Sequence, residues 1–240
     1  MIKFIATLLV VSGAFFIFQQ ATNAEISQAS KLTVVELFTS QSCSSCPPAD
    51  KLLTEISDDP NMITLGFHVT YWDHLHWKDT LSREFATKRQ RNYAGYKNTG
   101  RVYTPQMIVN GGAEFVGSSR GKLQSAVNKS KPVQPIAITV KNGQIELDLP
   151  ALPKSEQGDF TLWVYGTQAM HTQPIKSGEN RGRTVTYANS VLTQKRGDRW
   201  DGTARIITLD ALESEGLDGI TIIAQRDSFG TIVAAGKSAL

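Results

Sequence analysis

The sequence predicts an α/β domain in the N-terminal half, followed by a mostly β, sandwich-like domain. A buried strand, a helix and a second strand follow one another between residues 34 and 69, an order typical of a parallel βαβ unit. From residue 136 onward, short apolar strands alternate with Gly, Asn and Pro, a pattern typical of a β-sandwich. The composition changes at the proline-containing segment 131–135, so we place the domain boundary there, between domains 25–131 and 132–240.

The first strand and the helix after it flank a pair of cysteines. Residues 34–39 are rich in β-branched and aromatic side chains, which favours a buried strand. Between residues 49 and 56 apolar side chains recur at i, i+3, i+4 and i+7, which predicts a helix, and Pro47 and Pro48 fit only its first turn. Cys43 is therefore expected at or just before the helix N-terminus, where unpaired N–H groups and the helix dipole favour a thiolate.

The chain has two cysteines, and both lie in the sequence Cys43-Ser44-Ser45-Cys46. A disulfide across so short a loop contributes only roughly 2 kcal/mol in the chain-entropy model, against about 5 kcal/mol for a loop of about 100 residues. The spacing favours a redox-active pair, with Cys43 as the attacking thiolate and Cys46 as the resolving thiol. An inert disulfide and a metal site are the alternatives.

The N-terminal segment has the features of a secretory signal peptide, expected over residues 1–24. Lys3 precedes an apolar run at residues 4–18, and Ala24 provides a small residue at the cleavage site. The run is shorter than the roughly 20 residues that a spanning helix needs, so we expect no stable membrane span and a periplasmic or secreted protein. The formal net charge of +3, which falls when Lys3 is removed, argues against a dedicated nucleic-acid-binding protein.

The rest of the chain predicts further elements. Thr104-Pro105 precede a short apolar strand, and Asn110-Gly111 is typical of a hairpin turn. A helix is expected over residues 118–130, with a serine as its cap. Residues 168–183, which contain Gly and Pro, are expected to form a long exposed loop. The strands expected in the C-terminal half are 136–140, 145–149, 160–165, 184–189, 203–207 and 220–225.

The order of these elements resembles the thioredoxin fold over about residues 32–131. The resemblance rests on Cys-x-x-Cys-Pro at a helix start and on Thr-Pro about sixty residues later. In thioredoxin-like proteins the matching proline is cis and lies against the disulfide, and the residue before it pairs with the substrate backbone. The resemblance therefore implies substrate-binding roles for Thr104 and Pro105.

More closely, the chain resembles a family of secreted bacterial proteins catalogued only as a domain of unknown function, number twelve twenty-three. That family usually has Gly where His76 stands and often Asp where Thr70 stands, so we expect no essential role for either residue. The family resemblance implies a fold and a redox pair, but no substrate. It rests on the sequences Glu36-Leu37-Phe38-Thr39-Ser40-Gln41, Cys43-Ser44-Ser45-Cys46-Pro47-Pro48-Ala49-Asp50, Tyr71-Trp72-Asp73, Trp77-Lys78-Asp79 and Val102-Tyr103-Thr104-Pro105-Gln106.

Other residues could also take part in the chemistry. The thioredoxin resemblance implies that a buried acid on the first strand takes the proton of the resolving thiol, and Glu36 is the candidate, with an ordinary polar residue at a strand rim as the alternative. His68, His74 and His76 could join the cysteines around zinc or copper. One Cys-x-x-Cys with scattered histidines is a weak metal signal, so we expect no metal.

These observations lead us to expect an exported thiol–disulfide oxidoreductase that exchanges disulfides with partner proteins. Its partners would be protein thiols or disulfides, and no cofactor is expected. Two other functions stay open: a binding module for a peptide or glycan in which the disulfide is idle, and a copper or zinc carrier. Ser44-Ser45 adds no cation between the cysteines, so the sequence leaves the direction of electron transfer open.

Overall fold

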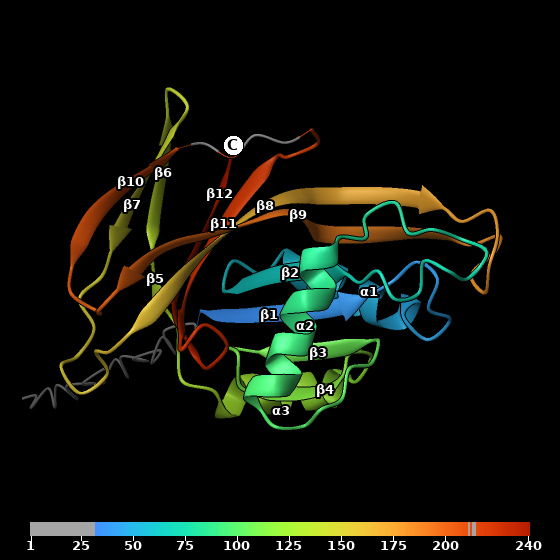
Figure 1. Ribbon diagram of the computed structural model, residues 1–240, viewed down its shortest axis with the longest axis horizontal. Helices are drawn as coiled ribbons and strands as arrows, with labels where there is room; N and C mark the ends of the chain where they lie inside the picture. Colours follow the sequence, from blue (N-terminus) through green and yellow to red (C-terminus); the bar gives the residue numbers. More distant parts are fainter. Residues whose placement is uncertain (1–31, 211, 213–214) are drawn as a thin grey trace, which may run out of the picture. The chain divides into compact units, whose positions relative to one another are not determined.

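The computed structural model describes residues 32–210, 212 and 215–240, which form a mixed α/β structure dominated by strands (Figure 1). A nine-stranded mixed sheet has the order β4-β3-β1-β2-β9-β8-β11-β12-β5, and a three-stranded antiparallel sheet has the order β10-β7-β6. In the described part of the chain, no helix is long and apolar enough to cross a membrane. The signal peptide expected at residues 1–24 lies outside the described residues.

The N-terminal half contains the elements that the sequence predicts. β1 and β2 run parallel with α1 between them, and β3 lies antiparallel on the other side of β1. Asn110 and Gly111 join β3 to β4 with positive φ angles of 48° and 67°, as a type I′ hairpin turn requires. The elements are β1 (Thr33–Thr39), α1 (Pro47–Ser57), β2 (Met62–His68), α2 (Glu84–Tyr96), β3 (Gln106–Val109), β4 (Ala113–Val116) and α3 (Arg120–Lys129).

The C-terminal half consists of strands in both sheets. β6 and β7 pack with β10 in the small sheet, while β8, β9, β11 and β12 extend the large one. The elements are β5 (Gln134–Pro135), β6 (Ala137–Lys141), β7 (Gln144–Leu149), β8 (Phe160–Pro174), β9 (Thr184–Trp200), β10 (Arg205–Asp210), β11 (Gly219–Arg226) and β12 (Ile232–Ala239).

The expected long exposed loop at residues 168–183 is wrong. β8 and β9 pair from Phe160 opposite Trp200 as far as Pro174 opposite Thr184, so only residues 175–183 connect them. The side chains in the distal part of β8 are mostly polar and partly exposed, so the sequence lacks the apolar pattern of a buried strand. The strand forms nevertheless, because its pairing depends on backbone hydrogen bonds. We call residues 175–183 the hairpin tip.

The two halves of the chain share one sheet. β2 lies parallel to β9 with Gly66 opposite Ser190. A Cβ on Gly66 would lie 3.3 Å from the backbone oxygen of Ala188, so a side chain there would require the neighbouring backbone to shift slightly. The predicted boundary at 131/132 falls between α3 and β5, and the division into two domains stays a prediction.

The two faces of β1 pack against different helices. Val35 and Leu37 share a core cluster with residues of α1. Phe38 and Val34 point to the opposite face, into a cluster that contains Tyr93 of α2, and Figure 1 shows α2 lying across this part of the sheet. Because side chains alternate along a strand, β1 separates the surroundings of α1 from those of α2.

Candidate functional site

The two cysteines lie in the connection between β1 and α1 and form a disulfide, with their Cα atoms 5.4 Å apart. Cys43 is 4% exposed and Cys46 is fully buried. Cys46 is the N-cap of α1, and Cys43 lies three residues earlier, between two turns. The expected position of Cys43 at the helix N-terminus therefore needs correction, because two consecutive turns separate β1 from the helix.

Asp50 lies one helical turn beyond Cys46 and is buried. Residues at i and i+4 share a helix face, so Asp50 follows Cys46 on the same side of α1. Thr39 Oγ1 donates a hydrogen bond of 2.7 Å to Asp50 Oδ1, whereas Asp50 Oδ2 has no hydrogen-bond partner among the described residues. Burial raises the pKa of Asp50 to about 7, although His68 and Thr39 act in the opposite direction.

His68 and Asp79 form a buried ion pair beside Asp50. His68 Nδ1 lies 2.8 Å from Asp79 Oδ2, which also accepts a hydrogen bond from the Gln41 backbone N–H. Burial alone would lower the pKa of His68, but the Asp79 carboxylate raises it. Burial alone would raise the pKa of Asp79, but His68 lowers it. These opposite shifts favour the charged form of both partners.

The space between Asp50 and His68 is dry. Tyr187 of β9 packs edge-on against His68, with the ring centroids 4.8 Å apart. The void lined by these three side chains has no room for a water molecule. The unpartnered oxygen of Asp50 therefore has neither a described protein donor nor a water in this void, which favours a protonated carboxyl group near neutral pH.

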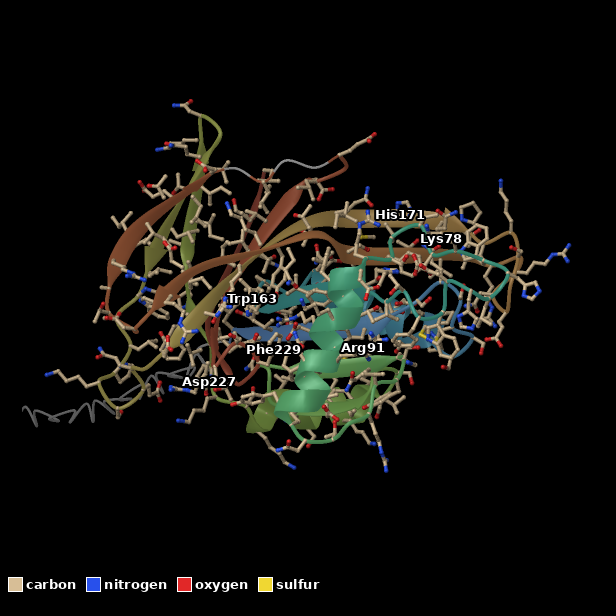
Figure 2. All side chains as sticks on the ribbon, viewed as in Figure 1. Lys78, Arg91, Trp163, His171, Asp227 and Phe229 are labelled. Carbon is tan, nitrogen blue, oxygen red and sulfur yellow. A yellow bond between two sulfur atoms is a disulfide. The ribbon has the colours of Figure 1, made fainter. Side chains whose placement is uncertain are left out.

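The structure does not bring Glu36 together with the cysteines. Its side chain lies on the α2 face of β1, where Arg89 Nε donates a 2.6 Å hydrogen bond to Oε1 and Tyr93 Oη donates one of 2.5 Å to Oε2. Figure 2 shows Trp163 and Phe229, two of the aromatic residues around Arg89, beside α2. Because β1 separates Glu36 from α1, the carboxyl group near Cys46 is Asp50 and not Glu36.

The peptide bond between Thr104 and Pro105 is cis, which confirms the cis bond that the thioredoxin resemblance implies at this position. Trp72 Nε1 donates a 2.8 Å hydrogen bond to Thr104 Oγ1, and Pro105 is buried. A Cβ on Gly117 would lie 3.4 Å from Pro105 Cβ and 3.3 Å from Ala49 Cβ, so Pro105 lies near the first turn of α1. The substrate-binding roles of Thr104 and Pro105 stay predictions.

The hairpin tip contacts residues 41–46, which carry both cysteines and which we call the cysteine turn. Sequence reasoning missed this contact. Asn180 is 1% exposed, and its Nδ2 donates hydrogen bonds of 2.9 Å to the backbone oxygens of Gln41 and Cys43. Glu179 Oε2 accepts a 3.3 Å hydrogen bond from the Ser44 backbone N–H. No local pattern signals these contacts, because more than 130 residues separate the partners along the chain.

An open hollow lies beside the hairpin tip. Its volume is about 550 Å³, and it is lined by Leu75, His76, Ser177, Gly178, Glu179 and Arg181. A larger hollow of about 750 Å³ lies between β4, α3 and β12, at the end of β1 opposite the cysteines. Among the described residues, no three His, Cys, Asp or Glu side chains are arranged to hold a metal ion.

Comparisons with known proteins identify a family and two similar structures. A family model described as "Protein of unknown function (DUF1223)" matches residues 34–225. The crystal structure of protein AGR_C_4864 from Agrobacterium tumefaciens is 29% identical, with a TM-score of 0.74 over 89% of this chain and 96% of that chain. HBP35 of Porphyromonas gingivalis shares the fold at 16% identity, with a TM-score of 0.53 over 88% of this chain and 76% of that one. No curated protein matches the chain.

Proposed function

The chain belongs to the family of proteins of unknown function DUF1223, and we propose that this member is an exported thiol–disulfide oxidoreductase. The observation that carries the proposal is the Cys43–Cys46 disulfide at the start of α1, with the buried Asp50 one turn further along. Export rests on the signal peptide expected at residues 1–24. The disulfide and the cysteine spacing support redox chemistry over an idle pair.

We further propose that the N-terminal elements form a thioredoxin-like unit. The order β1-α1-β2-α2-β3-β4-α3, with β1 between a parallel β2 and an antiparallel β3, supports this assignment. The cis bond before Pro105, near the first turn of α1, supports it as well. In this proposal Thr104 presents its backbone to the substrate.

The proposed reduction of a substrate disulfide takes two steps. The Cys43 thiolate attacks one sulfur of the substrate, a mixed disulfide forms, and the other substrate sulfur leaves as a thiolate that takes a proton from solvent. The Cys46 thiol then gives its proton to the Asp50 carboxylate and attacks Cys43 Sγ, which breaks the mixed disulfide. The second substrate sulfur leaves as a thiolate and takes a proton from solvent, and Asp50 returns its proton to solvent. The substrate gains two electrons and two protons, and the cysteine pair becomes a disulfide. Transfer in the opposite direction follows the same steps in reverse.

Trapping of mixed disulfides tests the proposed function. A Cys46→Ser variant should accumulate covalent adducts with partner proteins, because Cys43 can attack but no resolving thiol remains. Gel electrophoresis of extracts from the exporting host, with and without reducing agent, measures the adducts. The Cys43→Ser variant is the matched control and should form none.

Equal trapping by both variants, or by neither, would contradict the proposed roles of the two cysteines. A binding module with an idle disulfide would then be the better account. Metal analysis of the reduced protein tests the third function, a copper or zinc carrier. A carrier should retain the ion, whereas two thiolates without further ligands should not bind it tightly.

A further inference from the structure

The stability of the Cys43 thiolate decides in which direction the proposed pair transfers electrons. A pair whose reduced form is stabilised has an oxidising disulfide, and a pair whose thiolate lacks stabilising groups is a better reductant. Helix N-termini, cations and N–H donors are the groups that stabilise a thiolate.

The N-terminus of α1 offers Cys43 little stabilisation. Cys46 is the N-cap, and the first two helical residues, Pro47 and Pro48, have no backbone N–H. The next two N–H groups, of Ala49 and Asp50, both donate to Cys46 O. The partial positive charge at a helix N-terminus comes from its first four N–H groups, which have no acceptor within the helix. The two prolines remove two of these four groups from α1.

Two backbone N–H groups close to Cys43 also have other acceptors. Cys46 N donates to Cys43 O at 3.1 Å, and Ser44 N donates to Glu179 Oε2. The contact between Cys43 Sγ and Ser45 Oγ, 3.4 Å long, involves a neutral hydroxyl group. A neutral donor stabilises an anion less than a charged donor does.

Glu179 is exposed, and it places a carboxylate at the backbone of the residue that follows Cys43. Its carboxylate contacts the N–H of the residue that follows Cys43, and among the described residues it forms no ion pair. Arg181 lines the same hollow, but no ion pair between it and Glu179 is present among those residues. The buried Asn180 fixes the hairpin tip to Cys43 O, so it holds the neighbouring Glu179 close to the cysteine turn.

We propose that the Cys43–Cys46 pair acts as a reductant of protein disulfides, and that Glu179 is a positioning residue that destabilises the Cys43 thiolate. This inference rests on the proposed function. The dithiol form passes two electrons and two protons to a substrate disulfide and becomes the Cys43–Cys46 disulfide. A dithiol protein must then reduce that disulfide again, which makes the chain an intermediate between a dithiol donor and oxidised substrates.

Equilibration of the purified protein with glutathione buffers tests this inference. The wild-type pair should be more reducing than glutathione, so its dithiol form should reduce oxidised glutathione. Glu179→Gln keeps an acceptor for Ser44 N but removes the charge, and it should shift the equilibrium constant about threefold toward the dithiol. Because a tenfold change corresponds to about 30 mV, this shift is about 14 mV. The Cys43 pKa, measured by alkylation rate against pH, should fall in the same variant.

Two further variants sharpen the test. Pro47→Ala combined with Pro48→Ala restores two N–H groups and should shift the equilibrium in the same direction as Glu179→Gln. Glu146→Gln removes an exposed carboxylate from β7 in the small sheet and should leave the equilibrium unchanged.

The possible outcomes separate this inference from the proposed function. A wild-type disulfide that oxidises reduced glutathione, or a Glu179→Gln variant that behaves like Glu146→Gln, would overturn the inference and leave the oxidoreductase intact. A pair that does not exchange with glutathione or with dithiothreitol would overturn both.

Discussion

At the scale of single residues, Asp50 is the buried acid that lies one helical turn beyond Cys46. The sequence places it in the helix after the cysteines, but only its burial beside Thr39 and His68 gives it a pKa of about 7. Glu36 is equally buried, yet Arg89 and Tyr93 occupy both of its oxygens. The two buried acids thus differ in their surroundings, because both oxygens of Glu36 accept hydrogen bonds and one oxygen of Asp50 does not.

The stability of the protein should depend on pH through Asp50. Its pKa is 3.8 in a model peptide and about 7 in the folded chain, so the folded state binds the proton more tightly than the unfolded state does. This contribution to stability is therefore present at low pH and is lost as the pH rises from about 4 to about 7. The loss should be on the order of 2–4 kcal/mol. Urea denaturation of the oxidised protein between pH 4 and 8 measures it.

The matched variants isolate this effect. Asp50→Asn should flatten the pH dependence of the free energy of unfolding, because the amide does not titrate. Asp198→Asn, at an exposed position in β9, should retain the wild-type slope. An unchanged slope in Asp50→Asn would show that Asp50 titrates normally in the fold.

Asp50 should also set the rate at which Cys46 resolves a mixed disulfide. Without a proton acceptor near Cys46, the thiol must lose its proton to solvent, so Asp50→Asn should slow resolution at pH 7 by about tenfold or more. Quenched-flow analysis of a preformed adduct on Cys43 measures this step. Formation of the adduct should proceed at the wild-type rate, and a loss of both steps would point to a general structural defect.

At the scale of elements, the β8–β9 hairpin completes the site. Its tip supplies Asn180, Glu179 and Ser177, which contact the cysteine turn and the backbone of His76. β9 supplies Tyr187, which closes the space around His68. The hairpin therefore limits access to Cys43 from one side.

Removal of the Asn180 side chain tests that role. Asn180→Ala loses two hydrogen bonds to backbone oxygens, which should lower the free energy of unfolding by about 2 kcal/mol. Alkylation of Cys43 in the reduced protein should become several times faster at the same pH. Thr172→Ala, on the same hairpin but exposed, is the control and should alkylate at the wild-type rate. Identical rates in both variants would mean that the tip does not shield Cys43.

At the scale of the whole molecule, the two halves of the chain contribute to one core. Phe38 and Phe67 share a cluster with Trp163, Tyr165 and Ile223, which come from β8 and β11. The nine-stranded sheet crosses the predicted domain boundary through the pairing of β2 with β9. The C-terminal strands thus complete the environment of the N-terminal ones.

A fragment of residues 25–131 should therefore not fold cooperatively on its own. It would expose the β2 edge and the large apolar side chains that β8, β9 and β11 cover, and each such side chain contributes roughly 1.5–3 kcal/mol when buried. Circular dichroism during urea denaturation, with the chain 25–240 as the control, measures this. A sharp transition in the fragment would instead favour two independent domains.

The sequence by itself determined the local features of this protein. Hydrophobic periodicity and turn residues predict β1, α1, β2 and the β3–β4 hairpin, because these patterns depend on neighbours within a few residues. The cysteine pair and the cis proline were likewise identified by motif. Only the tertiary structure decided which acid accompanies Cys46, that Asn180 and Glu179 cover Cys43, and that one sheet joins both halves. Burial, strand alternation and pairing over more than 100 residues set these features, and no local pattern encodes them.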